Sequence, residues 1–351
     1  MTRPRQRKPV SHHLDPAGTA PVRVGLIGAG RIGTSHAGLL ARRVHGAHLV
    51  AVADPRPGVA EDLAGPLGAR ATTDADELVA DPAVDAVVIT ASSTAHAGLV
   101  VAAAAAGKHV FCEKPMGMSL EEIATATQAA ADAGVALQVG FNRRFVPDWA
   151  AAHRLVTDGA VGTPQILRSV TRDPGLADPG GVPPWTIFTQ TLIHDFDTLL
   201  WLNPGVEAVS VHATADALVA PDFKDAGLLD TAVVVVTFDN GAIAVAEASF
   251  SAAYGYDVRG EVFGSAGMVT MGDGARSSLR LSNVGGRHVE TARSDVELFG
   301  GAYAAELEEF VTAVREGRAP SVGGHDAHRA FAVALAAIAS VESGAPARVA
   351  R

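Results

Sequence analysis

The chain has 351 residues, of which 48% are hydrophobic and 19% charged, which is typical of a globular protein and excludes a disordered or collagen-like one. The formal net charge of -10 argues against nucleic acid as a partner, because phosphate binding needs a basic surface. The single cysteine, Cys112, excludes an intrachain disulfide and any zinc or iron–sulfur site built from several cysteines. Domains usually hold about 100–200 residues, so this length predicts two domains.

The N-terminal segment and the apolar runs bear on the location of the protein. Residues 1–20 are basic, lack the apolar stretch of a secretion signal and are predicted to be a disordered tail. No apolar run reaches the roughly 18–20 residues that span a bilayer, so we expect no membrane partner and a cytoplasmic location. Lysine is scarce, and its positions are Lys8, Lys108, Lys114 and Lys224.

Residues 21–145 alternate short apolar runs with segments of helical spacing. The predicted strands are Val22–Gly28, His48–Asp54, Asp85–Thr90, Lys108–Glu113 and Val135–Gly140. The predicted helices are Arg31–Val44, Thr94–Ala106 and Ser119–Ala133. Strands that alternate with helices predict a doubly wound parallel sheet of the Rossmann type, which places the fold in the α/β class.

Residues 146–325 carry mostly consecutive strands, which predict an α+β domain with a large, mainly antiparallel open sheet. The predicted strands are Thr163–Thr171, Val206–Thr214, Thr231–Phe238, Ala242–Phe250, Asp257–Phe263, Met268–Met271 and His288–Ala292. Asn240-Gly241 between two of these runs is a strong hairpin signal. The predicted helices are Leu192–Leu202, Ala302–Arg315 and Asp326–Val341. We expect residues 326–351 to pack back on the first domain.

The run Val233–Val236 is apolar at every position, so both faces of its strand are predicted to be covered. A helix or a second subunit could supply the second cover, and we favour a subunit. The second domain is therefore expected to form a homodimer or homotetramer through its sheet.

Residues 28–33 spell GAGRIG, a GxGxxG loop between a predicted strand and a predicted helix. The first glycine permits a tight turn, the second lets the backbone approach a pyrophosphate, and the third permits close packing of helix on strand. A carboxylate at Asp54, at the end of the second strand, favours NAD over NADP, although Arg56 leaves that choice open. The loop residues expected to bind the dinucleotide are Gly28, Gly30, Arg31, Ile32 and Gly33.

Two further segments carry residues suited to proton and hydride chemistry. Lys114 follows a predicted strand on the same rim as the glycine loop, where its charge could stabilise a developing alkoxide. His194 heads a predicted helix and could act as a general base, with Asp197 on the same helical face. The alternatives are a surface lysine and a structural histidine. No HExxH or similar motif is present, so no metal is expected.

Several stretches together resemble the glucose–fructose oxidoreductase/inositol dehydrogenase (Gfo/Idh/MocA) family. They are GAGRIG (28–33), AGKHVFCEKPM (106–116), GFNRRF (140–145), IHDFD (193–197) and YGYDVRGEVFGSAG (254–267). The resemblance covers roughly residues 22–343, and GFNRRF with YGYD is most similar to the inositol 2-dehydrogenase and sugar dehydrogenase branch.

The resemblance implies roles for individual residues. Lys114 would contact the reacting hydroxyl and the nicotinamide ribose, and His194 would be the acid/base. The residues expected along the cofactor are Ala91, Ser92, His96 and Glu113. The residues expected to bind substrate, besides Lys114 and His194, are Asn142, Arg143, Asp173, Gln190 and either Tyr254 or Tyr256, with Tyr254 favoured. Arg144 is open to a structural role as an ion pair.

One position departs from the family pattern. Where the inositol dehydrogenases have an aspartate four residues before the histidine, this chain has Gln190. Four residues make one helical turn, so the glutamine side chain is expected to meet His194 as a third catalytic residue, without a charge. This change puts the substrate in doubt more than the reaction class.

The expected function is NAD-dependent oxidation of a secondary hydroxyl of a cyclitol or pyranose, with Lys114 and His194 as the catalytic pair. Two alternatives remain open. One is cleavage of glycosides by transient oxidation with NAD. The other is a non-catalytic NAD-binding sensor or partner protein, which the glutamine at position 190 favours.

Overall fold

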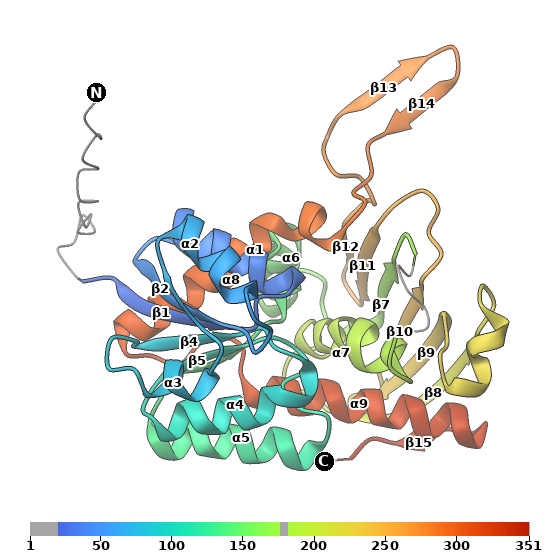
Figure 1. Ribbon diagram of the computed structural model, residues 1–351. Coiled ribbons are helices and arrows are strands. Elements are labelled where there is room, and N and C mark those ends of the chain that lie inside the picture. The colour runs from blue at the N-terminus through green and yellow to red at the C-terminus, as the bar shows by residue number, and fades with distance from the viewer. Residues whose placement is uncertain (1–19, 176–181, 351) are drawn as a thin grey trace, which may run out of the picture.

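The computed structural model describes residues 20–175 and 182–350, and it divides them between two large sheets with their helices (Figure 1). The predicted tail, residues 1–20, lies outside the described residues apart from Ala20.

The first sheet has six parallel strands in the order β3-β2-β1-β4-β5-β6, which confirms the predicted doubly wound sheet. Its strands are β1 (Val22–Ile27), β2 (Ala47–Ala53), β3 (Arg70–Thr72), β4 (Ala86–Ile89), β5 (His109–Cys112) and β6 (Leu137–Val139). Its helices are α1 (Arg31–Arg42), α2 (Val59–Leu67), α3 (Ala75–Ala80), α4 (Ser93–Ala105) and α5 (Leu120–Ala133). The strand order reverses between β1 and β4, and ligands bind at such a point, beyond the carboxyl ends of the strands.

The sequence explains why these segments adopt their structures. Strand β4 has the sequence AVVI and is buried at every position, as expected for a parallel strand with helices on both faces. Helix α5 begins where the Ser119 side chain accepts a hydrogen bond from the backbone N–H of Glu122, and it ends at Gly134 in the left-handed conformation. These capping signals fix the two ends of α5.

The second sheet has the order β12-β11-β7-β10-β9-β8-β15, and only the pair β7–β10 is parallel among the described strands, so the mainly antiparallel prediction is confirmed. Its strands are β7 (Pro164–Arg172), β8 (Ala208–Asp216), β9 (Thr231–Phe238), β10 (Ile243–Ser249), β11 (Asp257–Gly264), β12 (Met268–Met271) and β15 (Ala347–Arg348). The helical segments between the sheets and within this part are η1 (Asn142–Phe145), α6 (Pro147–Thr157), the π-helix η3 (Ile187–Thr191), α7 (Leu192–Trp201) and η4 (Pro221–Ala226).

The two faces of the second sheet differ. One face is covered by α6, α7 and α9 (Gly324–Ser343), and Val234 and Val236 of β9 point into this core. On the opposite face Val233 is 44% exposed and Val235 37% exposed. In the described part of the chain this face is therefore open, and the predicted second cover is not found among these residues.

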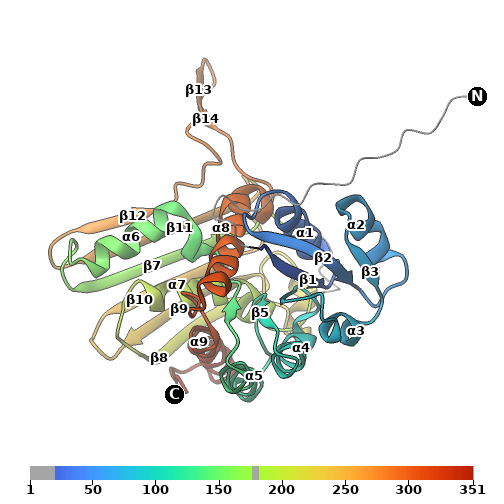
Figure 2. The same cartoon turned by 90° about the vertical axis from the view of Figure 1, so that its left-hand side faces the viewer.

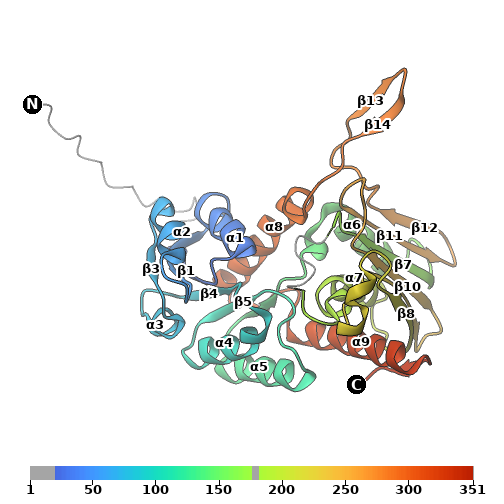
Figure 3. The same ribbon diagram turned by 45° about the vertical axis from the view of Figure 1, so that its right-hand side comes forward.

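The two closing helices tie the sheets together (Figure 3). Helix α8 (Asp295–Glu316) starts seven residues earlier than predicted, because Ser294 caps it by accepting from the backbone N–H of Glu297. It packs on α1 and on the first sheet, although the predicted boundary assigned this segment to the second domain. Helix α9 contacts α5 of the first sheet as well as α7 and β8 of the second, so it bridges both parts.

A separate hairpin of β13 (Arg280–Asn283) and β14 (Gly286–Val289) projects from the body of the molecule (Figure 2). The strand predicted over His288–Ala292 was expected in the large sheet, but its start pairs locally across the tight turn between Asn283 and Gly286.

Candidate active site

Two adjoining cavities lie at the carboxyl ends of the first sheet's strands. The loop cavity, of about 620 Å³, is lined by the glycine loop and the end of β2. The central cavity, of about 550 Å³, lies between the glycine loop, η1, α7 and α8. Gly30, Thr90 and Ala91 line both cavities, which therefore form one elongated site.

The structure brings most of the predicted site residues to these cavities. Those that line the loop cavity are Gly28, Gly30, Asp54, Ala91 and Ser92. Those that line the central cavity are Gly30, Arg31, Ile32, Ala91, His96, Glu113, Lys114, Asn142, Arg143, Asp173, Gln190 and His194. Gly33 and Tyr254 line neither cavity.

The glycine loop has the geometry of a phosphate cradle. Gly28 has a φ of 100°, which favours glycine, and a Cβ on Gly33 would lie 1.8 Å from the carbonyl oxygen of Gly28. A Cβ on Gly30 would meet nothing within 4 Å, so open space lies above this residue. No side chain caps the start of α1 and its first turn carries no acid, which leaves its N–H groups available to an anion. These residues fit the pyrophosphate of a dinucleotide.

Asp54 lies at the far end of the loop cavity and is held as an anion. It accepts a hydrogen bond from the backbone N–H of Ala29 at 2.9 Å and a two-point ion pair from the guanidinium of Arg56 at 2.8 and 2.9 Å. The hydrogen bonds from Arg56 and Ala29 outweigh burial and lower the pKa of Asp54 to about 2. A fixed carboxylate suits ribose hydroxyls and disfavours a 2′-phosphate.

Lys114 follows β5 and reaches into the central cavity, where its Nζ donates to the backbone carbonyl of Gln190 at 2.9 Å. Burial lowers the pKa of Lys114, and the charge of Glu113 acts in the opposite direction. Lys108 donates to two backbone carbonyls and Lys224 pairs with Asp216, and neither of them lines the central cavity.

His194 also lines the central cavity, and its ring packs edge-on against Phe141. Its Nδ1 is buried and has no hydrogen-bond partner among the described residues. Burial, then the charges of Lys114 and Arg143, lower the pKa of His194 well below its usual value. The ring is therefore neutral near pH 7 and can accept a proton.

The expected contact between Gln190 and His194 is not found. The side-chain amide of Gln190 donates to Ser93 Oγ at 3.1 Å, while its backbone carbonyl accepts from Lys114. Gln190 belongs to the π-helix η3, whose turn is wider than that of an α-helix, so a four-residue spacing does not align the two side chains. Gln190 thus contacts Lys114, through its backbone carbonyl, rather than His194.

The acidic residues after His194 are structural. Asp195 is fully buried and pairs with Arg143 at 2.7 Å. Asp197, which was expected on the face of His194, instead pairs with Arg144 at 2.5 Å, and Arg144 also pairs with Asp326 of α9. Arg144 therefore has the structural role left open by the sequence.

The polar residues of the central cavity include Tyr256, where the sequence favoured Tyr254. Tyr256 lines the central cavity and hydrogen-bonds to Asp173, whereas Tyr254 is 54% exposed and donates to Asp257. Burial is the main cause that raises the pKa of Asp173 to about 6. Asn142 is buried, and its Oδ1 has no partner among the described residues. These groups leave hydrogen-bonding capacity for a neutral, hydroxylated molecule.

His96 connects the segment after β4 with the turn after β5. Its Nδ1 contacts the carbonyl oxygen of Pro115 at 2.8 Å and its Nε2 contacts that of Ala91 at 3.0 Å. The ring thereby holds the end of β4 against the turn after β5.

Helix α8 contributes residues that the sequence did not indicate: Asp295, Phe299 and Tyr303. Asp295 pairs with Arg31 at 2.6 Å and accepts from Tyr303. No motif marks this segment, since it is far along the chain and meets the glycine loop only through tertiary packing. Tyr256, in contrast, was one of the two tyrosines of the YGYD stretch that the sequence offered for the pocket.

Among the residues described, no helix is both long enough and apolar enough to cross a membrane.

Comparisons with known proteins agree with this site. Residues 22–141 match a family model described as an oxidoreductase family with an NAD-binding Rossmann fold, and residues 149–270 match the GFO/IDH/MocA C-terminal domain. A myo-inositol 2-dehydrogenase of Thermotoga maritima is 37% identical, covering 92% of this chain and 96% of the relative. A scyllo-inositol 2-dehydrogenase (NAD(+)) of Bacillus subtilis is 36% identical, covering 93% and 95%.

Solved structures give the same result. The scyllo-inositol dehydrogenase of Lactobacillus casei, with bound NAD(H) and scyllo-inositol, superposes with a TM-score of 0.90 at 28% identity and covers 94% of this chain and 100% of that one. A glycine cradle at the switch point of the first sheet, a second sheet that closes the cavity, and matches to both family models lead to one conclusion. The chain belongs to the Gfo/Idh/MocA family of NAD-dependent oxidoreductases.

Proposed function

We propose that this chain, an NAD-dependent dehydrogenase acting on CH–OH groups, oxidises a secondary hydroxyl of an inositol-type polyol or a pyranose, with Lys114 and His194 as its catalytic pair. One observation carries the proposal: both side chains line the cavity that continues from the glycine loop. The relatives named as inositol dehydrogenases support the substrate class.

The charge states of His194 and Lys114 suit the removal of the hydroxyl proton and the stabilisation of the oxygen that it leaves. NAD, when bound, accepts a hydride from the carbinol carbon. The lowered pKa of His194 leaves its ring neutral near pH 7, and this unprotonated ring accepts the hydroxyl proton. The ammonium of Lys114 donates to the same oxygen and stabilises the negative charge that develops there. The carbonyl of Gln190 orients that ammonium.

The remaining hydroxyls of the substrate need partners of both kinds. Asn142 offers an acceptor without a partner of its own, and the Asp173–Tyr256 pair offers an acceptor and a phenol. We assign substrate binding to these three residues, with Tyr256 in place of Tyr254. Few charges and many hydrogen-bonding groups suit a neutral polyol.

One observation favours the alternative of an NAD-binding protein without turnover. His194 Nδ1 has no acceptor or donor among the described residues, so none of them fixes the tautomer through that atom. A sensor of this kind would bind NAD and polyol but produce no NADH.

The experiment is NADH formation across inositols and simple pyranoses, with NAD binding measured separately. The wild type is expected to turn over at least one polyol, and Lys114→Ala to lose about 100-fold or more in kcat while it still binds NAD. Lys114→Arg is expected to be equally impaired, because a planar, longer guanidinium misplaces the charge. An active Lys114→Ala enzyme would overturn the assignment. NAD binding without turnover on any polyol would favour the sensor.

The open face of the second sheet supports the oligomer expected from the sequence. Exposed apolar residues lie along adjacent strands, at Ile166 of β7, Ile243 of β10, and Val233 and Val235 of β9. We propose that a second copy of the chain covers this face, since exposed apolar side chains gathered on adjacent strands are typical of interfaces. A location in the cytoplasm remains a prediction.

A further inference from the structure

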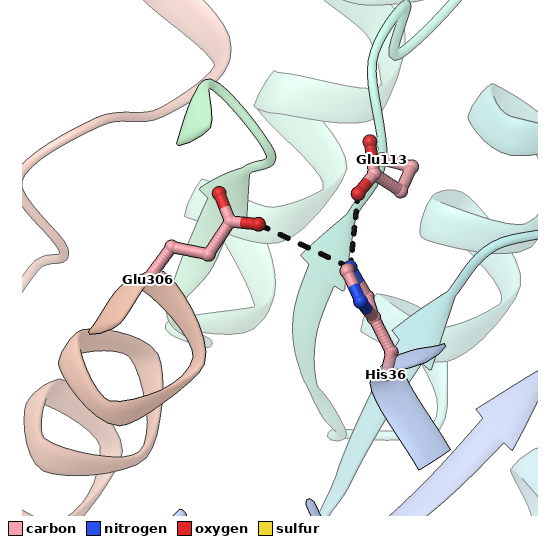
Figure 4. Close-up of side chains that lie close together, drawn as sticks. All are labelled: His36, Glu113 and Glu306. Carbon is pink, nitrogen blue, oxygen red and sulfur yellow. Dashed lines mark hydrogen bonds and ion pairs between the residues drawn. The ribbon is translucent and has the colours of Figure 1, made fainter. Parts of the chain in front are cut away.

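A buried cluster lies directly behind the proposed catalytic lysine. It joins His36 of α1, Glu113 at the end of β5 and Glu306 of α8, three segments that are distant in the sequence (Figure 4). Nε2 of His36 donates to Oε1 of Glu113 at 2.9 Å, and Oε2 of Glu113 accepts from the backbone N–H of Lys114 at 3.2 Å. The cluster therefore connects to the active site through the residue next to Lys114.

Glu306 is the unusual member of the cluster. Its side chain is fully buried, and neither carboxyl oxygen has a hydrogen-bond partner among the described residues. Nε2 of His36 lies 4.0 Å from Oε1 of Glu306, beyond hydrogen-bond distance, and already donates to Glu113. A buried carboxylate without a donor is far less favourable than a buried carboxylic acid, so this geometry favours the protonated form of Glu306.

The electrostatics of the two acids agree with this geometry. Burial, then the charge of Glu113, raise the pKa of Glu306 well above its usual value. Burial also acts to raise the pKa of Glu113, but the hydrogen bond and charge of His36, with the charges of Lys114 and His96, outweigh it and lower that pKa. Two acids this close do not both ionise in a dry site. Glu113 therefore carries the charge and Glu306 the proton.

Lys114 depends on that charge. Burial lowers the pKa of the lysine, and among the charges that raise it Glu113 comes first, ahead of Asp295 and Asp173. Arg31 acts with burial, and the neutral His194 contributes no charge. Without the negative charge of Glu113, the lysine would more readily lose the proton that it needs.

We propose that His36 is a positioning residue for this reaction: it holds Glu113 as a fixed anion behind Lys114 and thereby keeps the lysine ammonium charged, while Glu306 stays neutral beside the pair. His36 supplies the donor that stabilises the carboxylate, and the protonated Glu306 leaves Glu113 without a competing charge. The functional meaning rests on the proposed dehydrogenase activity, but the charge states can be measured without any turnover.

The first test concerns the proton on Glu306. Infrared spectra at pH 7 of the wild type and of Glu306→Gln are compared in the carbonyl region, where a protonated carboxylic acid absorbs and a carboxylate does not. We expect a band in the wild type that Glu306→Gln lacks and that the matched control Glu308→Gln, on the same helix, retains. Absence of the band, or a stoichiometric metal ion in the wild type that is lost in Glu306→Gln, would overturn the proposal.

The second test measures Lys114 directly. The chain has only four lysines, so [13Cε]lysine labelling gives few NMR signals, and Lys114→Arg assigns the relevant one. We expect Glu113→Gln to lower the titration midpoint of Lys114 by about one pH unit or more. His36→Leu is expected to lower it as well, His36→Gln to restore it through the amide donor, and Glu306→Gln to leave it unchanged.

An unchanged midpoint in both Glu113→Gln and His36→Leu would overturn the proposal, and so would a shift in Glu306→Gln. These results do not depend on a substrate. A protein with the expected titrations but no turnover on any polyol would contradict the proposed function and leave the assignment of charges standing. Where turnover is found, the alkaline limb of kcat/KM is expected to move with the Lys114 midpoint.

Discussion

Asp173 follows the last residue of β7, yet its carboxyl group lies in the central cavity beside Tyr256. Its pKa is raised to about 6, chiefly by burial, so the group changes charge within the range in which enzymes are assayed. Above that pH it is a carboxylate and a strong acceptor for hydroxyl groups, and below it the acid is a weaker acceptor.

The direction of this charge change at Asp173 predicts how KM depends on pH. For the wild type, KM for the polyol should rise as the pH falls through about 6, because the acceptor is protonated. In Asp173→Asn, an isosteric change, KM should be higher and nearly independent of pH, with a smaller effect on kcat. Steady-state kinetics between pH 5 and pH 8 check this, and an unaltered pH dependence of KM in the variant would contradict it.

Gln190 gives a second prediction, which concerns kcat. Gln190 lines the same cavity as Lys114 and His194, so the charge of a carboxylate at this position would favour the protonated form of both across that cavity, without a direct contact. Gln190→Asp is therefore expected to move the acid limb of kcat to higher pH, while Gln190→Asn, which keeps the amide, should leave that limb in place. Activity on inositol should be kept or increased. Loss of activity on every substrate would show that the amide has a required role of its own.

The limits of sequence reasoning are visible at single residues. Lys114, His194 and Asn142 were predicted to line the site, and they do. Each could be predicted because it lies in a motif next to the end of a strand or helix. The contact between Gln190 and His194 failed because a π-helix, which tertiary packing sustains, replaces the assumed α-helical turn. Asp295 was not predicted because its ion pair with Arg31 joins segments that are far apart in the sequence.

At the scale of elements, the glycine loop contains one glycine that serves cofactor binding and another that serves the stability of the fold. Space is open above Gly30, whereas the backbone of Gly28 fills the place of a Cβ on Gly33. The two glycines therefore serve different purposes, one toward the ligand and one toward the packing of α1 on β1.

The pair gives a matched prediction. Gly30→Ala should fold with an unchanged melting temperature but bind NAD at least about tenfold more weakly, because its methyl group occupies the approach of the pyrophosphate. Gly33→Ala should lose NAD binding together with about 1–3 kcal/mol of stability, because overpacking displaces α1. Calorimetric titration with NAD and thermal unfolding measure the two effects, and equal melting temperatures for the two variants would contradict the assignment.

The elements themselves were predictable to different degrees. Continuous apolar runs such as AVVI gave the parallel strands, since only burial on both faces explains them. The start of α8 was missed because Gly300 and Gly301 lower helix propensity, while the cap at Ser294 and packing on the first sheet sustain the helix. The pairing of β14 with β13 depends on a local turn rather than on apolar pattern.

At the scale of the whole molecule, α8 and α9 make the two sheets one unit around the cavity, and the open sheet face remains. We predict that Val235→Asp, which places a charge on that face, lowers the molar mass in solution to that of the monomer. The control Val284→Asp, on the fully exposed hairpin tip, should leave the mass unchanged. Light scattering after size exclusion measures this, and a wild type that is already monomeric would contradict the proposed interface.

The central claim is that Lys114 and His194 act on a carbinol carbon placed beside NAD. The most direct measurement is isotope transfer: inositol deuterated at its ring carbons is incubated with NAD and the enzyme, and the NADH formed is analysed by mass spectrometry. The account predicts one deuterium in the nicotinamide of each NADH formed by the wild type, and none formed at a comparable rate by Lys114→Ala. NADH without deuterium, or the same transfer by Lys114→Ala, would contradict it.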